Sequence, residues 1–181
     1  MKQIAPIRKE LGVRTVFNFL GPFLNPAGVK RQLIGVPNSA IAKKLASVAV
    51  RLGYEHALIV SSKDGMDEIS IASPTQIYEI KDKKITSRVI KPSQFNLKKA
   101  PLSVIAGGDA SKNSSTILEI LEGRRSSYRD IVVLNSAHAL YVSGKAKSVK
   151  EGIVLSQDAV DSGAAMQILQ ELIKETKRYA Q

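Results

Sequence analysis

Two adjacent acids, Asp67 and Glu68, are of a type and placement that could hold a metal ion. They follow the apolar run from Ala57 to Val60, whose branched side chains are typical of a buried strand. Open α/β sheets bind ligands beyond the carboxyl ends of their strands, and Mg²⁺ usually takes one or two carboxylates plus substrate phosphates. Because neighbouring side chains in extended backbone point to opposite sides, the pair could serve two ions. The alternative is a solvated acidic turn, which the spacing alone favours.

The other residue types that often act in catalysis give weaker signals of a site in this sequence. His56 stands at the start of the same predicted strand and His138 lies in an apolar segment, so both are predicted to be structural. The chain has no cysteine, which excludes disulfides, zinc–thiolate sites and a thiol nucleophile. A Ser-His-Asp hydrolase is not supported, because the sequence has no nucleophile elbow.

A β-α-β unit is predicted to position the acid pair. Residues 32–36 form the first strand, Asn38 or Ser39 caps a helix that ends at Gly53, and residues 56–60 form the second strand. The predicted apolar face of the helix consists of Ile41, Leu45, Val48 and Leu52. This unit brings the acids to one edge of a parallel strand pair.

A β-hairpin is predicted next. Residues 76–81 and 84–89 alternate in polarity around Asp82-Lys83, which would form the turn. Residues 91–103 contain two prolines and form a linker or excursion from the sheet.

The rest of the chain is predicted to be helical. One helix is expected at residues 111–122, and a second, apolar nearly all round and therefore central, at 131–142. A capping box at Ser148 starts a third helix, which is interrupted at residues 162–163. The charged tail, residues 174–181, is predicted to fray.

Composition limits the partners. The 181 residues carry a net charge of +11, which attracts anions such as phosphorylated metabolites or nucleic acid. The basic residues are dispersed and aromatic residues make up 5%, so a stacking surface for single-stranded nucleic acid is poorly supported. No apolar run approaches the roughly 18 residues of a membrane span. A cytoplasmic protein without a membrane partner is the resulting expectation.

Several motifs together resemble one enzyme family, anthranilate phosphoribosyltransferase, and specifically its C-terminal α/β domain. In order, the motifs that carry the resemblance are Val-Arg-Thr-Val-Phe-Asn-Phe-Leu-Gly-Pro at 13–22, Asn-Pro-Ala at 25–27, Gly-Met-Asp-Glu-Ile at 65–69, Gly-Gly-Asp-Ala at 107–110 and Asp-Ser-Gly-Ala at 161–164. Their order and spacing cover nearly all of residues 1–181. The resemblance implies an α/β fold with a mixed, largely parallel sheet flanked by helices, a fold shared with nucleoside phosphorylases.

The resemblance also implies an activity and site residues. Members transfer phosphoribose from phosphoribosyl pyrophosphate to anthranilate in tryptophan biosynthesis, with Mg²⁺ as cofactor. The family pattern assigns Asp67 and Glu68 to the metal. It assigns Arg8 to anthranilate, whose carboxylate suits the two parallel donors of a guanidinium, and Pro22 to the wall of the anthranilate channel. The alternative for Arg8 is a cation at a helix end, and for Pro22 a loop-forming proline.

The chain differs from the family pattern because one part of that pattern is missing. Family members begin with a helical domain that carries a glycine-rich phosphate loop, and no counterpart occurs here. The Gly-Gly-Asp at 107–109 comes too late to be that loop. The resemblance therefore implies a fragment that is inactive alone and binds phosphoribosyl pyrophosphate incompletely. The full-length family dimerises through the helical domain, so a monomer is an alternative for this chain.

Two other functions remain open from the residues. A pyrimidine nucleoside phosphorylase-like domain would share the fold, but the acid pair and Asn25-Pro26 favour the anthranilate enzyme. An inactive relative that binds nucleic acid would suit the net charge, and its binding would weaken steeply with salt. The retained acids and Arg8 argue against it.

Overall fold

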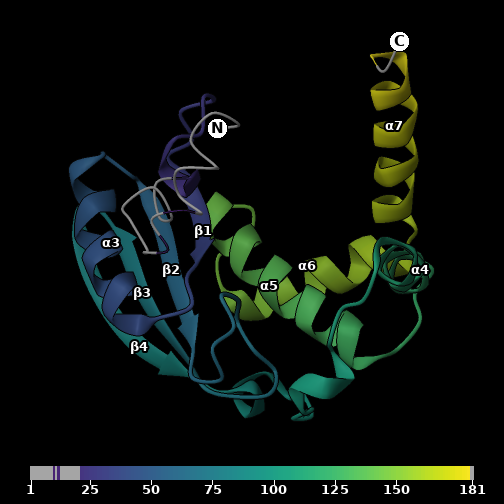
Figure 1. Ribbon diagram of the computed structural model, residues 1–181, viewed down its shortest axis with the longest axis horizontal. Helices are drawn as coiled ribbons and strands as arrows, with labels where there is room; N and C mark the ends of the chain where they lie inside the picture. Colours follow the sequence, from purple (N-terminus) through teal and green to yellow (C-terminus); the bar gives the residue numbers. More distant parts are fainter. Residues whose placement is uncertain (1–9, 11, 13–20, 180–181) are drawn as a thin grey trace.

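The computed structural model describes residues 10, 12 and 21–179, in which a four-stranded sheet lies beside a set of helices (Figure 1). The described elements are, in order, η1 (Gly21–Phe23), β1 (Arg31–Gly35), α3 (Ser39–Arg51), β2 (His56–Ser62), β3 (Thr75–Lys81), β4 (Lys84–Ile90), η2 (Pro92–Phe95), η3 (Leu102–Val104), α4 (Ala110–Leu121), α5 (Ser127–Ser143), α6 (Val149–Asp161) and α7 (Ala164–Arg178).

The strands lie in sequence order, β1-β2-β3-β4. β1 and β2 are parallel, with Leu33 opposite Leu58, whereas β2–β3 and β3–β4 are antiparallel. The mixed α/β class is thus confirmed, but the expectation of a largely parallel sheet is wrong for these strands. The reason is the connection at residues 63–74, which turns back as a loop, whereas a parallel neighbour would need a longer crossover.

Helix α3 packs on the sheet through small side chains. Asn38 is its N-cap, accepting from the Ala40 backbone nitrogen at 2.8 Å, as predicted. The predicted apolar face is wrong in part, because Val48 and Leu52 are 39% and 45% exposed. The fully buried residues are Ala42, Ala46 and Ala49. Alanines let the helix lie close to the sheet, and the larger apolar residues border the contact.

The predicted hairpin is confirmed as β3 and β4. Asp82 and Lys83 form its two-residue turn with φ values of 51° and 61°. Two positive φ angles match the turn type that follows the natural twist of a hairpin, although glycine is the residue that adopts them most easily.

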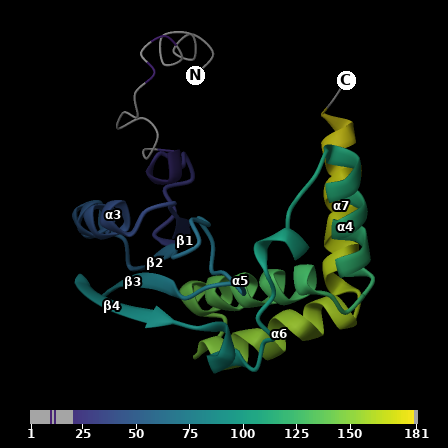
Figure 2. The same cartoon turned by 60° about the horizontal axis from the view of Figure 1, so that its bottom comes forward.

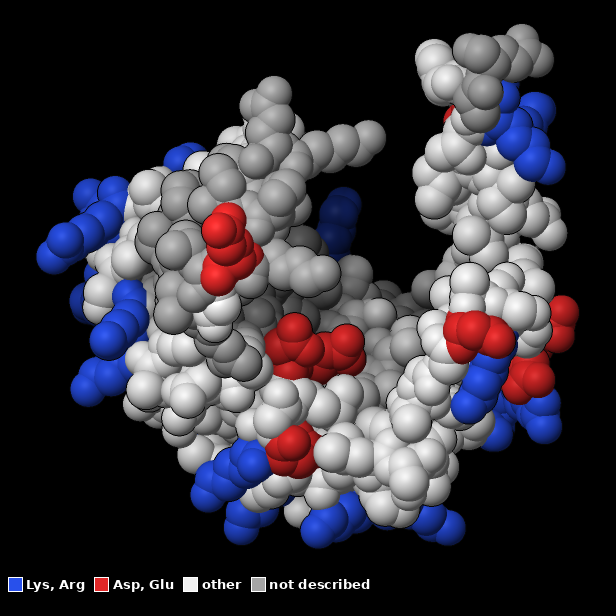
Figure 3. Space-filling model, viewed as in Figure 1, with Lys and Arg blue, Asp and Glu red and all other residues white. Residues whose placement is uncertain are grey.

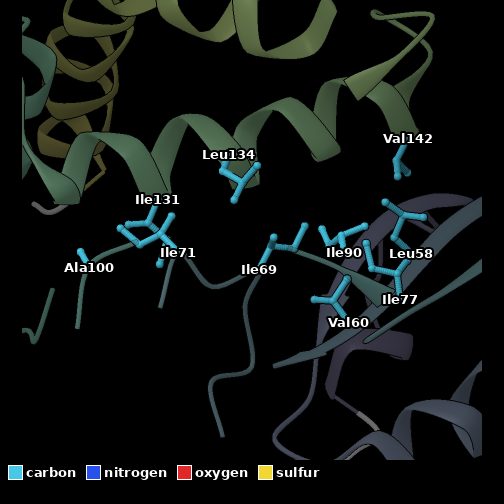
Figure 4. Packing of buried hydrophobic residues seen from close by; sticks show 10 residues of the cluster. All are labelled: Leu58, Val60, Ile69, Ile71, Ile77, Ile90, Ala100, Ile131, Leu134 and Val142. Carbon is cyan, nitrogen blue, oxygen red and sulfur yellow. The ribbon is translucent and has the colours of Figure 1, made fainter. Parts of the chain in front are cut away.

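Helix α5 is the predicted central helix. Its side chains Ile131, Leu134 and Val142 face Leu58 and Ile69 in the main core cluster (Figure 4). α6 crosses α5 closely, since a Cβ on Gly152 would lie 2.5 Å from the Ala137 carbonyl oxygen. Helix α5 therefore lies between the sheet and helix α6 and contacts both.

Helix α7 stands away from the sheet, with α4 alongside it (Figures 1 and 2). None of its residues is buried. It continues to Arg178, so the tail predicted to fray is helical over 174–178. Within the described residues, no helix combines the length and the hydropathy needed to cross a membrane.

Candidate functional site

Asp67 and Glu68 lie beyond the carboxyl end of β2, in the loop of residues 63–74. Both are exposed, and both line a cavity of about 390 Å³ between the sheet and α5. The cavity is lined by Leu33, Gly35, Val60, Asp67, Glu68, Ile131, Val132, Asn135 and Ser136. In Figure 3, acidic side chains gather in the hollow at the centre of the visible face, whereas most lysines and arginines lie around the outline of the molecule.

The end of β1 supports this loop through a backbone contact. A Cβ built on Gly35 would lie 1.4 Å from the carbonyl oxygen of Asp67. No side chain fits in that space, so residue 35 must be glycine for the loop to lie where it does. The position of Asp67 thus depends on β1 as well as on β2.

Helix α5 holds the other side of the loop through Asn135. Its side-chain oxygen accepts from the Ile69 backbone nitrogen at 3.0 Å, and its side-chain nitrogen donates to the Ile69 carbonyl at 2.9 Å. The same nitrogen donates to the Ile131 carbonyl, one helical turn earlier, at 2.9 Å. Ile69 is fully buried, so the residue that follows the acid pair is fixed both by packing and by hydrogen bonds.

Asp64, the third acid of the loop, has a structural role. Its carboxylate accepts from the Met66 backbone nitrogen at 3.2 Å and from the Ser70 hydroxyl at 2.6 Å. Burial alone would raise the pKa of Asp64, but the hydrogen bonds from Ser70, Ser62 and Met66 outweigh it and hold the pKa below its usual value. Asp64 therefore stabilises the turn, which leaves Asp67 and Glu68 as the carboxylates that face the cavity.

The described side chains supply only part of the ligands that a cation needs. Among the described residues, no group of three or more His, Cys, Asp or Glu side chains could enclose a metal ion. Two carboxylates at an open cavity suit Mg²⁺, which retains water and takes further oxygens from substrate phosphates. Both acids lie in bends, so the sequence argument from extended backbone does not apply to them.

Of the two predicted anthranilate residues, the structure describes only Pro22. Pro22 is partly exposed in η1 and is not among the residues that line the cavity. Its neighbour Phe23 packs edge-on against Tyr54, with ring centroids 5.8 Å apart. Arg8 lies outside the described residues.

Sequence reasoning missed Gly35 and Asn135. Gly35 falls within a predicted strand, and no local pattern shows a close backbone approach to a loop that comes much later in the chain. Asn135 is a polar residue within the most apolar helix of the chain, and that contrast was the available signal.

Comparison with known proteins gives the family. The model of the "Glycosyl transferase family, a/b domain" matches residues 1–166. The chain belongs to this glycosyl transferase family. It is 45% identical to anthranilate phosphoribosyltransferase from Thermoanaerobacter sp. (strain X514), over 98% of this chain and 53% of that protein. It is also 45% identical to the enzyme of the same name from Rhodopseudomonas palustris (strain TIE-1), over 96% of this chain and 51% of that protein.

Solved structures of glycosyl transferase family members agree. Anthranilate phosphoribosyltransferase from Thermus thermophilus is 34% identical and superposes with a TM-score of 0.87, covering 94% of this chain and 50% of that one. The Saccharomyces cerevisiae enzyme in complex with PRPP and Mg is 29% identical with a TM-score of 0.89, covering 98% of this chain and 52% of that one. The chain spans about half the length of the relatives it matches.

Proposed function

We propose that this chain forms the metal-binding half of an anthranilate phosphoribosyltransferase, an enzyme of tryptophan biosynthesis that acts in the cytoplasm. The observation that carries the proposal is the placement of Asp67 and Glu68 at a cavity, between the glycine contact of β1 and the Asn135 contact of α5. Two exposed carboxylates supported by fixed backbone suit a site that is completed by a phosphorylated substrate.

In this proposal Asp67 and Glu68 hold Mg²⁺, which neutralises charge on the leaving pyrophosphate. The contacts of Asn135 and Gly35 hold the loop in place. Folding of the chain therefore overcomes the repulsion between the two carboxylates before the metal binds. The cavity also has apolar residues in its wall, among them Leu33 and Ile131, which offer no competing charge beside the carboxylates.

Arg8 and Pro22 bind anthranilate in this proposal. Arg8 contacts the carboxylate of anthranilate, and Pro22 contacts its aromatic ring. The amine of anthranilate is already a nucleophile, so the chain needs to position it and needs no strong base. The phosphate groups of phosphoribosyl pyrophosphate are bound by a glycine-rich loop in the other half of the enzyme. We therefore expect no turnover from the 181 residues alone.

The test separates metal binding from activity. A Mg²⁺ titration followed by amide NMR should shift the signals of residues 64–69, and the double variant D67N/E68Q should abolish these shifts. Glu122→Gln, which removes a carboxylate beyond the end of α4, is the matched control and should leave them unchanged. Unchanged shifts in the double variant would contradict the metal assignment.

Activity is tested by mixing. Phosphoribosylanthranilate formation is measured for the chain alone and after addition of the N-terminal half of the Thermoanaerobacter relative. The proposal is supported if the chain alone gives no product and the mixture does. Turnover by the chain alone contradicts it. Light scattering of both samples tests the expectation that the complete enzyme is a homodimer while this chain alone is monomeric.

A further inference from the structure

A second cavity, larger than the one beside the acids, lies at the opposite end of the parallel strands. Its volume is about 600 Å³. It is bordered by the first residues of β1 and β2, the turn between β3 and β4, and the carboxyl end of α5. Because Asp67 and Glu68 follow the carboxyl end of β2, this cavity is no part of the candidate metal site.

Three ammonium groups border this cavity without an ion-pair partner among the described residues. They belong to Lys81, Lys83 and Lys147, and none of them forms a salt bridge with a carboxylate in that part of the chain. The two carboxylates in the lining are Glu55, which pairs with Arg31 at 3.2 Å, and Asp82. The cavity therefore carries an excess of positive charge.

The end of helix α5 does not account for these lysines. Cations are often found near the last carbonyls of a helix. Here Arg31 already donates to the Val142 carbonyl at 3.2 Å, and the backbone nitrogens of Lys145 and Ala146 both donate to the Leu140 carbonyl. Most of the last carbonyls of the helix thus accept from groups other than these lysines, which leaves the three ammonium groups for a ligand.

The inner wall of the cavity is held by hydrogen bonds. His56 is 3% exposed and lines the cavity, and its Nε2 lies 2.8 Å from Glu79 Oε1. Tyr141 donates to the same oxygen at 2.7 Å, and its ring packs edge-on against His56. The Lys81 ammonium lies 6.0 Å from the centroid of the Tyr141 ring. An aromatic wall beneath cations that have no ion-pair partner in the described part of the chain is typical of a binding pocket.

The turn that carries Lys83 to the cavity is strained. Lys83 has a φ of 61°, where glycine is the favoured residue. A lysine at this position makes the fold less stable than a glycine would, because its Cβ is crowded in the left-handed conformation. Residues kept in such conformations cluster at functional sites, and here the side chain concerned borders the cavity.

We propose that this cavity binds a small organic phosphate, with Lys81, Lys83 and Lys147 around the phosphate and the wall of Tyr141 and His56 against the organic part. Charge favours an anion, and three separate ammonium groups suit a phosphate better than a single carboxylate. The volume exceeds what an inorganic phosphate needs, which leaves room for a sugar or similar group. The site is independent of the proposed transferase activity.

The test uses ribose 5-phosphate and inorganic phosphate as probes, in EDTA so that Asp67 and Glu68 carry no metal. Binding is measured by calorimetry and mapped by the amide signals of Gly53 and Gly144 at the rim of the cavity. We expect ribose 5-phosphate to bind more tightly than inorganic phosphate, by about fivefold or more. Equal affinities would overturn the assignment of an organic phosphate.

Variants make the test specific. Lys83→Gly should weaken ribose 5-phosphate binding about tenfold through loss of one charged contact. It should also raise the melting temperature by about 2 °C, because the turn is relieved of strain. Lys43→Ala, on the exposed side of α3, removes the same charge and should change neither. Undiminished binding by Lys83→Gly, or an equal loss in Lys43→Ala, would overturn the proposal, and the Mg²⁺ titration would be unaffected in either case.

Discussion

Asn135 of α5 pairs with the backbone of Ile69 as a strand neighbour would, accepting from its nitrogen at 3.0 Å and donating to its carbonyl at 2.9 Å. Within residues 21–179 no strand pairs with the loop that carries Asp67 and Glu68, and one side chain supplies hydrogen bonds of the kind that a strand would make. The placement of two exposed carboxylates thus depends on a residue that lies 66 positions after Ile69 in the chain.

We expect Asn135→Ala to lower the free energy of unfolding by about 1–3 kcal/mol, because the buried Ile69 amide loses its acceptor. Mg²⁺ affinity should fall about tenfold, because the acid pair is no longer held. Urea unfolding and the NMR titration measure the two effects. Ser136→Ala is the matched control, since Ser136 is the next residue of the helix and lines the same cavity. Intact Mg²⁺ affinity in Asn135→Ala would show that the loop is held by packing alone.

We expect Gly35→Ala to destabilise the chain by more than about 3 kcal/mol, because the added Cβ would overlap the Asp67 carbonyl oxygen. The backbone of β1 or of the loop would have to move, so Mg²⁺ binding should weaken as well. Thermal unfolding is the measurement. Gly21→Ala is the control, because a Cβ there meets nothing within 4 Å and should change little. Equal melting temperatures for the two variants would contradict the close approach.

His138 should make stability depend on pH. Burial lowers the pKa of His138 to about 4 from its ordinary value of 6.5, so the folded chain keeps the ring neutral where the unfolded chain protonates it. Its contribution is complete above pH 6.5 and is lost as the pH falls toward 4. Between about pH 7 and about pH 5 we expect a loss of roughly 2 kcal/mol.

The measurement for His138 is urea unfolding across that pH range. In His138→Leu the slope of stability against pH should largely disappear. A slope that persists in this variant would mean that another group causes it.

Glu79 joins three elements, since its buried carboxylate contacts His56 of β2, Tyr141 of α5 and Arg88 of β4. Burial raises the pKa of Glu79, but the bonds from Arg88, Tyr141 and His56 outweigh it, so the pKa lies below its usual value. We expect Glu79→Gln to destabilise the chain by about 2–4 kcal/mol near neutral pH and to reduce the loss of stability at acid pH.

Chemical unfolding of Glu79→Gln is compared with that of Glu119→Gln. Glu119 forms an exposed pair with Arg124, so its loss should change stability by less than about 1 kcal/mol. Similar effects in both variants would show that burial adds nothing to the Glu79 contacts.

The sequence predicted the elements and the acid pair better than it predicted the contacts between them. Asn38 as a cap and Asp82-Lys83 as a turn were identifiable because their signals are local. The buried face of α3 was misjudged because large side chains were expected to be buried, whereas close packing on the sheet selects Ala42 and Ala46. The direction of β3 depends on how a loop returns, which no periodicity encodes.

In the candidate site, too, the local features were predicted and the long-range contacts were not. Asp67 and Glu68 stood out by type and position, and the family resemblance gave them a role. Gly35 and Asn135, which hold them, act across the fold, and such contacts arise only when distant segments meet. Sequence reasoning finds groups that could react more easily than groups that position them.

The order of the strands also has a consequence for the way the chain acquires its structure. Each of the four described strands pairs with its neighbour along the chain, so residues 31–90 can form this sheet without waiting for later segments. During synthesis the sheet would form first, while the loop of residues 63–74 stays open until α5 emerges and Asn135 reaches Ile69. We expect amide protection at Ile69 to develop after that of β2, which places the acid pair among the last parts of the molecule to mature.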